Sequence, residues 1–119
     1  MDVEETLYTV LSTAPELAGL AVRPDVAMIS DTAPYIVYKL ISGKRVNSLA
    51  GDSGLANPYY QIDVYAKDPA SRASLKKAVR IAVLGNLSLG AVHIDEGSDY
   101  EIDTKLFRSR QDFSIWFND

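Results

Sequence analysis

The chain has 119 residues, of which 47% are hydrophobic and 24% charged, and its formal net charge is −4. This acidic balance argues against a nucleic-acid-binding protein, and the absence of cysteine excludes a disulfide scaffold and thiolate chemistry. No segment is apolar over the ~20 residues that a membrane span needs, and the acidic start "MDVEET" does not resemble a signal peptide. We therefore expect one globular domain over residues 1–119, made in the cytoplasm, with no membrane contact and no sequence-specific binding of nucleic acid.

Residues 2–11 have the pattern of an amphipathic helix. Four apolar side chains recur at helical spacing along one face: Val3, Leu7, Val10 and Leu11. Asp2 is placed to cap the first turn, with Glu5 three residues later. The pattern stops before Pro15, and we expect irregular structure from there to Pro24.

Two stretches rich in β-branched and aromatic residues predict a pair of strands, "PYIVYKLIS" at residues 34–42 and "YYQIDVYA" at residues 59–66. Their alternation predicts one core-facing set of side chains: Ile36, Tyr38, Leu40, Tyr60, Ile62, Val64 and Ala66. Residues 42–58, between these strands, are polar and contain three glycines. Because hairpin loops usually take about two to five residues, we expect a hairpin with an unusually long loop as its tip.

The second half of the chain predicts a helix and two strands. Asp68 can cap a helix that starts at Pro69 and stops at Gly85. The buried stripe of this helix is predicted to be Leu75, Ala78, Val79 and Ala82. A short strand at residues 90–94 follows, and then an acidic run at residues 95–103.

The final strand places aromatic residues on both of its faces. Phe113, Ile115 and Phe117 share the core face, Trp116 lies on the other, and we expect a β-bulge near residues 109–112. The order helix-strand-strand-helix-strand-strand predicts an α+β fold. We expect a four-stranded, mainly antiparallel sheet packed on two helices, with the long hairpin loop at residues 42–58.

The polar residues do not form a catalytic pattern. His93 is the single histidine, and a structural role inside its strand is favoured over a role as catalytic base. The acidic run at residues 95–103 is interpreted as a solvated turn, with a calcium site as the alternative, although its spacing does not match a calcium loop. We therefore expect no catalytic residue, no cofactor and no bound metal.

Two surface features have open interpretations. Arg72, Lys76 and Arg80 form a basic stripe on the second helix, either a solvated face or a contact for an acidic surface such as residues 95–103 of another copy. A further set of aromatic residues lies opposite the predicted core: Tyr35, Tyr59, Tyr65 and Trp116. This set either marks a protein interface or is covered by the irregular residues 13–33.

Three segments taken in order resemble a known family: "PYIVYKLISG", then "YQIDVYAKDP", then the closing "LFRSRQDFSIWF". They are similar to the small tail-completion proteins of long-tailed bacteriophages, which include minor tail and head-to-tail joining components. The resemblance extends over residues 34–117. It implies a structural protein that assembles, typically as a six-membered ring, at the head-proximal end of the tail tube and offers a surface to the head connector.

This resemblance implies partners and a location. The partners are other copies of the chain in a hexameric ring, the tail tube protein and the head connector protein. The location is the bacterial cytoplasm during assembly and then the virion tail. The alternative is a small α+β module that binds a ligand or a regulatory partner through its exposed tyrosines and has no catalytic activity.

The long loop at residues 42–58 then becomes a candidate contact that orders on a neighbouring subunit, the tube or the connector. A tolerated surface insertion is the alternative, since long loops cost little free energy. The residues expected at interfaces come from this loop, the basic stripe and the final strand: Lys44, Arg45, Leu49, Leu55, Arg72, Lys76, Arg80 and Trp116.

Overall fold

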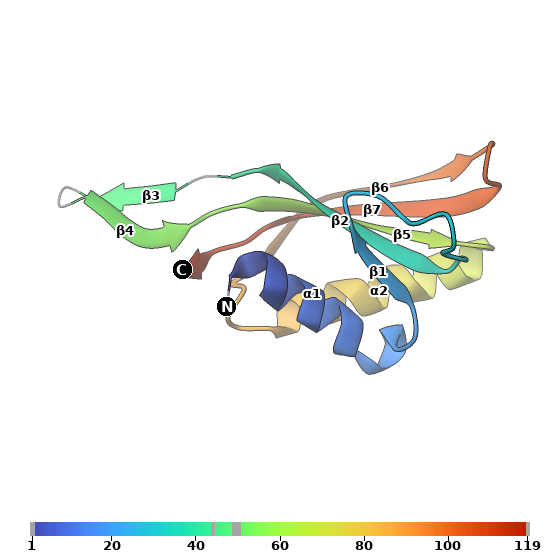
Figure 1. The fold of residues 1–119 in the computed structure, drawn as a ribbon, viewed down its shortest axis with the longest axis horizontal. Helices are drawn as coiled ribbons and strands as arrows, with labels where there is room; N and C mark the ends of the chain where they lie inside the picture. Colours follow the sequence, from blue (N-terminus) through green and yellow to red (C-terminus); the bar gives the residue numbers. More distant parts are fainter. Residues whose placement is uncertain (1, 44, 49–50, 119) are drawn as a thin grey trace.

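The computed structural model describes residues 2–43, 45–48 and 51–118. A five-stranded sheet carries both helices on one face (Figure 1), which confirms the α+β class. The helices are α1 (Val3–Thr13) and α2 (Pro69–Gly85). In spatial order, the strands are β1 (Ala21–Pro24), β2 (Tyr35–Ser42), β5 (Tyr59–Ala66), β7 (Leu106–Ser114) and β6 (Val92–Glu101).

The sheet is mixed, because β1 runs parallel to β2 while the other neighbours are antiparallel. The prediction of a four-stranded sheet was wrong, since it left residues 21–24 in an irregular segment. This strand is only four residues long and ends at Pro24, so it has no alternation that sequence reasoning could detect. The short helix η1 (Pro15–Leu17) turns the chain so that these residues pair with the edge of β2. Proline is tolerated there because the edge of a sheet leaves one side of a strand unpaired.

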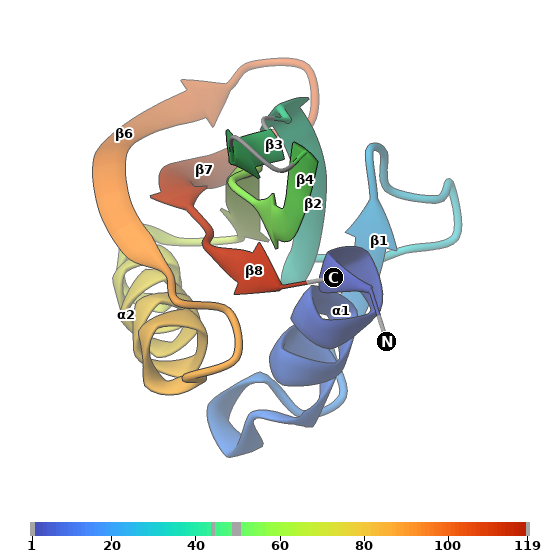
Figure 2. The same ribbon diagram turned by 90° about the vertical axis from the view of Figure 1, so that its left-hand side faces the viewer.

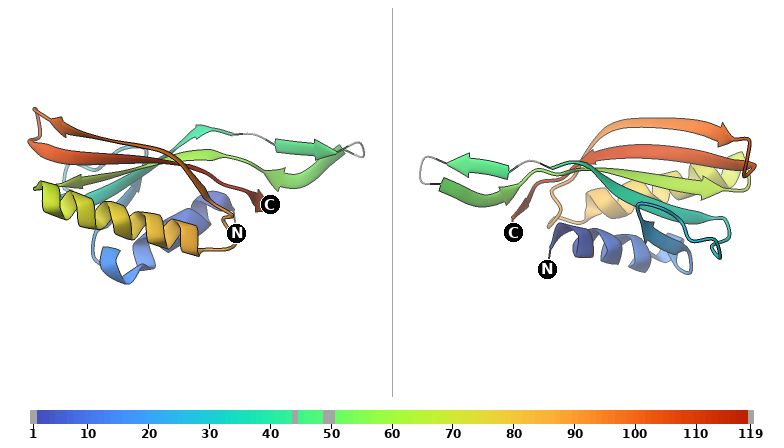
Figure 3. Two further views of the ribbon diagram at one scale, coloured as in Figure 1. Left: turned by 180° about the vertical axis from the view of Figure 1, so that it is seen from behind. Right: turned by 45° about the horizontal axis from the view of Figure 1, so that its top comes forward.

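A second, three-stranded sheet projects from the body (Figures 1 and 3). Its strands are β3 (Arg45–Ser48), β4 (Gly51–Ala56) and β8 (Phe117–Asn118). The prediction of a long loop at residues 42–58 was therefore wrong: β3 and β4 continue β2 and β5 as a ribbon, and the molecule is 52 Å long. Glycine and serine have low strand propensity, so backbone pairing across the ribbon, rather than side-chain pattern, defines these strands.

The acidic run was also wrongly predicted as a turn. Residues 95–101 belong to β6, a ten-residue edge strand that pairs with β7 along its length. A β-bulge interrupts this pairing between His93 and Asp95, so the irregularity expected in residues 109–112 lies in the partner strand. Bulges and charged side chains are common on edge strands because both discourage pairing with another chain.

Both predicted N-caps are confirmed. The Asp2 Oδ1 atom accepts a hydrogen bond from the Glu5 amide at 2.8 Å, and the Asp68 Oδ1 atom accepts one from the Ser71 amide at 2.7 Å. Gly85 is the last residue of α2, as expected. These caps fix where the two helices begin.

The core lies between the helix layer and the sheet, as the view along the long axis shows (Figure 2). Its fully buried members come from both layers: Leu7, Leu11, Val79, Val83, Ile36, Ile62, Val64 and Phe113. Leu40 was expected there, but it is 54% exposed because β2 has by then passed the helices and its register with β5 shifts. Neither helix in the described part of the chain is long and apolar enough to cross a membrane.

Candidate functional site

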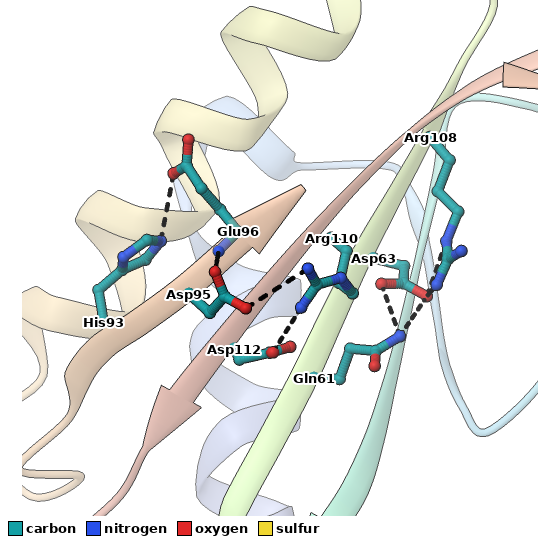
Figure 4. Close-up of polar contacts among 8 residues, drawn as sticks. All are labelled: Gln61, Asp63, His93, Asp95, Glu96, Arg108, Arg110 and Asp112. Atoms are coloured by element: carbon teal, nitrogen blue, oxygen red, sulfur yellow. Dashed lines mark hydrogen bonds and ion pairs between the residues drawn. The ribbon is translucent and has the colours of Figure 1, made fainter. Parts of the chain in front are cut away.

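The sheet face opposite the helices carries a network of paired charges (Figure 4). At its centre Asp63 of β5 is only 5% exposed. The Arg108 guanidinium donates to its Oδ2 atom at 3.2 and 2.9 Å, and the Gln61 amide donates at 3.1 Å. Burial raises the pKa of Asp63, while Arg108 opposes that shift. The pair thus holds a carboxylate that the fold has largely removed from water.

The same network extends to the edge strand. Arg108 also reaches Asp99 of β6 at 3.3 Å, and Arg110 lies between Asp95, at 3.6 Å, and Asp112. Gly97 makes room for Arg110, since a Cβ atom there would lie 2.9 Å from the guanidinium. Cross-strand pairs of opposite charge stabilise a sheet, so these acidic residues serve β6 as pairing partners for β7.

On the helix side, the basic stripe meets the acidic run of its own chain. Lys76 forms an ion pair with Glu96, which lowers the pKa of Glu96, and Arg72 donates to the Asp99 carbonyl at 3.3 Å. Lys76 and Arg72 could bind residues 95–103 of another copy only if these contacts within the chain were broken. Arg80 is exposed and makes no ion pair or hydrogen bond within the described residues.

His93 makes the contacts of a structural residue. Its ring meets the Phe113 ring edge-on, with centroids 5.3 Å apart, and its Nε2 atom lies 3.4 Å from Glu96. Within residues 2–43, 45–48 and 51–118, no three histidine or acidic side chains gather as metal ligands would.

The exposed aromatic set is partly covered. Tyr35 and Tyr65 stack on each other with centroids 4.9 Å apart. Residues 25–27 lie beside these two rings and line a hollow together with them. Trp116 is 45% exposed, and its amide donates to the Leu89 carbonyl at 2.9 Å. The sheet face therefore offers less free aromatic surface than the sequence predicts.

The ribbon is attached to the body by a buried asparagine that sequence reasoning did not single out. The Asn57 side chain donates to the Ser114 hydroxyl at 2.9 Å and to the Ile115 carbonyl at 2.8 Å. The Ile115 amide donates to the Pro58 carbonyl at 2.9 Å. The dipeptide Asn-Pro is typical of turns, so Asn57-Pro58 could have indicated this turn from the sequence. These bonds hold the start of the ribbon against the end of β7.

A hollow of about 460 Å³ at the start of α1 was also missed. Its lining comes from the first turns of the helix and from β2: Asp2, Glu4, Glu5, Tyr8, Thr9 and Tyr38. Burial, together with Glu4 and other acidic groups, raises the pKa of neighbouring Tyr60 to about 12. The sequence could not reveal this hollow, because Tyr38 is 29 residues or more from the other side chains and reaches them only through the packing of α1 on the sheet.

The residues expected at interfaces do not form one site. Arg45 and Leu55 belong to the ribbon strands β3 and β4, whereas Lys44 and Leu49 lie outside the described residues. The remaining members are on α2 and between β7 and β8: Arg72, Lys76, Arg80 and Trp116. The ribbon and the helix layer are therefore two separate candidate surfaces.

The chain matches a known protein family and is similar in fold to a solved structure. The family model described as "Tail completion protein gp17" matches residues 5–118. A chain in the virion of a native gene transfer agent particle is similar in fold, with a TM-score of 0.66, 17% identity, and coverage of 96% of this chain and 92% of that one. A chain from Akkermansia muciniphila, solved without its transmembrane region, gives a TM-score of 0.38 at 11% identity, covering 68% of this chain and 44% of that one. No curated protein matches the sequence.

Proposed function

This chain belongs to the tail completion protein gp17 family, and on that premise we propose that it closes the head-proximal end of a tail, as a ring that caps the tail tube or joins it to the head connector. The membership confirms the resemblance found in the sequence. The chain is a structural component of a phage-type tail, with other tail or head proteins as partners. Its assembly in the bacterial cytoplasm, its ring and its particular partners belong to the proposal.

The projecting ribbon carries this proposal. In the sheet order β3-β4-β8, the outer edges belong to β3 and β8. Strand edges present unpaired amide and carbonyl groups, and they bind extended segments of other chains by adding a strand. The ribbon extends past the helix layer, so a partner can reach it without disturbing the core (Figure 3). We assign its contact to a neighbouring copy, the tail tube or the connector.

The alternative function is that of a module that binds a ligand on its exposed tyrosines. Tyr35 and Tyr65 stack on each other, and residues 25–27 lie beside them, so this surface is already partly occupied. The arginines and carboxylates on this same sheet face, which lies opposite the helices, are paired with one another, as a structural network requires. These observations favour an assembly component, and the proposal includes no catalytic residue and no cofactor.

A shortened ribbon tests the proposal. Residues 47–54 are replaced by Asn-Gly, which suits a two-residue hairpin turn and retains the pairs Arg45–Ala56 and Val46–Leu55. Removing residues 46–56 outright would also delete Ala56, which pairs with Phe117 of β8. In producing cells that lack the native chain, the shortened variant should fold and yet give few completed particles.

The matched control shortens the turn at the other end of the molecule. Residues 102–105 connect β6 to β7, and their replacement by Asn-Gly shortens a connection between two strands far from the ribbon. This control should restore particles to near the native number. Normal particle numbers with the shortened ribbon, counted by electron microscopy, would refute the role of the ribbon.

A further inference from the structure

We infer that Arg80 of one copy binds in the acidic hollow at the start of α1 of the next copy, an inference that rests on the ring in the proposed function. The occupant is thus the cationic face of α2 of a second chain. This assigns two different surfaces of one chain to a single contact that repeats around the ring.

The hollow has the groups that a guanidinium needs. Glu4 and Glu5 are exposed, and their carboxylates make no ion pair or hydrogen bond within the described residues. Asp2 is already used to cap the helix. The hollow lies among these groups and measures about 460 Å³, which leaves room for a side chain. Arginine binds a single carboxylate through two parallel hydrogen bonds, and the second glutamate adds negative charge nearby.

A tyrosine of β2 gives the hollow a polar group besides the carboxylates. Tyr38 is only 4% exposed and lines the hollow from β2. It has no hydrogen-bond partner among the residues that the structure describes. Its hydroxyl is not one of the enclosed polar atoms without a partner, so it is open to the hollow and can accept a hydrogen bond from an entering side chain. The ring of Tyr8, which is also part of the lining, can lie against the flat face of a guanidinium.

The matching cation lies on α2. Lys77 and Arg80 are exposed, and in the described part of the chain neither makes an ion pair or a hydrogen bond. Arg80 lies close enough to Glu96 to affect its pKa, but the ion pair of Glu96 is with Lys76. On the same helix face, Ile81 and Leu84 are 60% and 41% exposed. Spacings of three and four residues thus place two cations beside two uncovered apolar side chains.

The two surfaces lie where a ring needs them. Seen along the long axis, α1 and α2 are on opposite flanks of the helix layer (Figure 2). The start of α1 and the end of α2 both lie toward the ribbon (Figure 1). A contact between two different patches repeats from copy to copy, and it closes into a ring when the rotation at each contact divides a full turn; otherwise it gives an open filament. Complementary charge fixes the orientation of such a contact.

Charge reversal tests this contact. The variants Glu4→Arg/Glu5→Arg and Lys77→Glu/Arg80→Glu each place like charges on both sides of it. Each should raise the concentration needed for self-association by roughly tenfold or more, measured by light scattering. An equal mixture of the two variants should recover assembly, because every contact in an alternating ring again joins opposite charges. Lys76→Gln is the control, since it removes a positive charge from the same helix that is used within the chain.

A second measurement detects weak association. The native chain has no cysteine, so Thr9→Cys/Leu84→Cys, which retains Glu4, Glu5 and Arg80, can be crosslinked with a short bis-maleimide at these two positions alone. Oligomers larger than a dimer are expected, whereas each single cysteine variant stops at a dimer. If both charge-reversed variants form rings at the same concentration as the wild type, this contact is overturned, while the proposed function is unaffected. A chain that neither self-associates nor crosslinks beyond a dimer would overturn the contact as well, and the particle counts described above would decide the proposed function separately.

Discussion

Lys76 of α2 and Glu96 of β6 form an ion pair that joins the helix layer to the edge strand of the sheet. The pair explains why a cationic helix and an acidic strand occur in one small chain. Lys76 is therefore used within the chain, whereas the neighbouring Arg80 makes no ion pair within the described residues and remains available on the surface.

Removing the positive charge of Lys76 should therefore affect stability more than removing that of Arg80. Both partners of the Lys76 pair are partly exposed, so Lys76→Gln should lower the free energy of unfolding by only about 0.2–1 kcal/mol. The difference should shrink in high salt. Arg80→Gln should change it by less than about 0.5 kcal/mol. Urea denaturation of both variants checks this, and equal effects would contradict the assignment.

The buried carboxylate of Asp63 should make stability depend on pH. Its pKa in the folded chain is raised, so folding favours the protonated form. The corresponding contribution to stability is present below the pKa of the unfolded chain and is lost as pH rises through the folded pKa. The free energy of unfolding of the wild type minus that of Asp63→Asn should therefore be larger at pH 4 than at pH 7. Urea denaturation at both values measures this difference, and a difference of the opposite sign would refute the inferred shift.

Gly90 and Gly85 should respond to alanine in opposite directions. Gly90 has φ +50°, and a Cβ atom there would lie 2.8 Å from the Trp116 carbonyl oxygen, so Gly90→Ala should destabilise by about 1–3 kcal/mol. Gly85 ends α2 with open space around it. Gly85→Ala should stabilise by up to about 1 kcal/mol, because alanine favours the helix. Thermal unfolding measures both changes, and a neutral Gly90→Ala would show that the turn at Leu89 does not depend on its contact with Trp116.

Asn57 should control how firmly the ribbon is attached. Asn57→Ala leaves the buried Ile115 carbonyl without this donor and should cost about 1–3 kcal/mol. The loss should be concentrated at the start of the ribbon, where hydrogen exchange of the Ile115 amide would speed up. Uniform exchange across the whole sheet would instead indicate a general loss of stability.

Much of the fold follows from local pattern. Asp2 and Asp68 cap the helices as predicted, and the alternation of residues 59–66 predicts their buried face. In contrast, β1 and the ribbon strands β3 and β4 lack hydrophobic alternation of their own and are defined by backbone pairing, so periodicity could not reveal them. The acidic residues of β6 resemble a turn until Arg108 and Arg110 are seen across the sheet.

The candidate surfaces were less accessible to sequence reasoning than the fold. The basic stripe was recognised, but which of its members is free depends on the neighbouring strand β6. The acidic hollow combines the start of α1 with Tyr38 of β2, and only the packing of the two layers brings them together. Long-range packing therefore decides which charges remain available to a partner.

Electron microscopy of particles from producing cells that lack this chain tests its role at the tail end most directly. Heads and tails should accumulate unjoined, with over-long tails if the chain caps the tube and tails of normal length if it joins the tube to the connector. Complete particles of normal tail length, at the wild-type proportion, would contradict a role in tail completion.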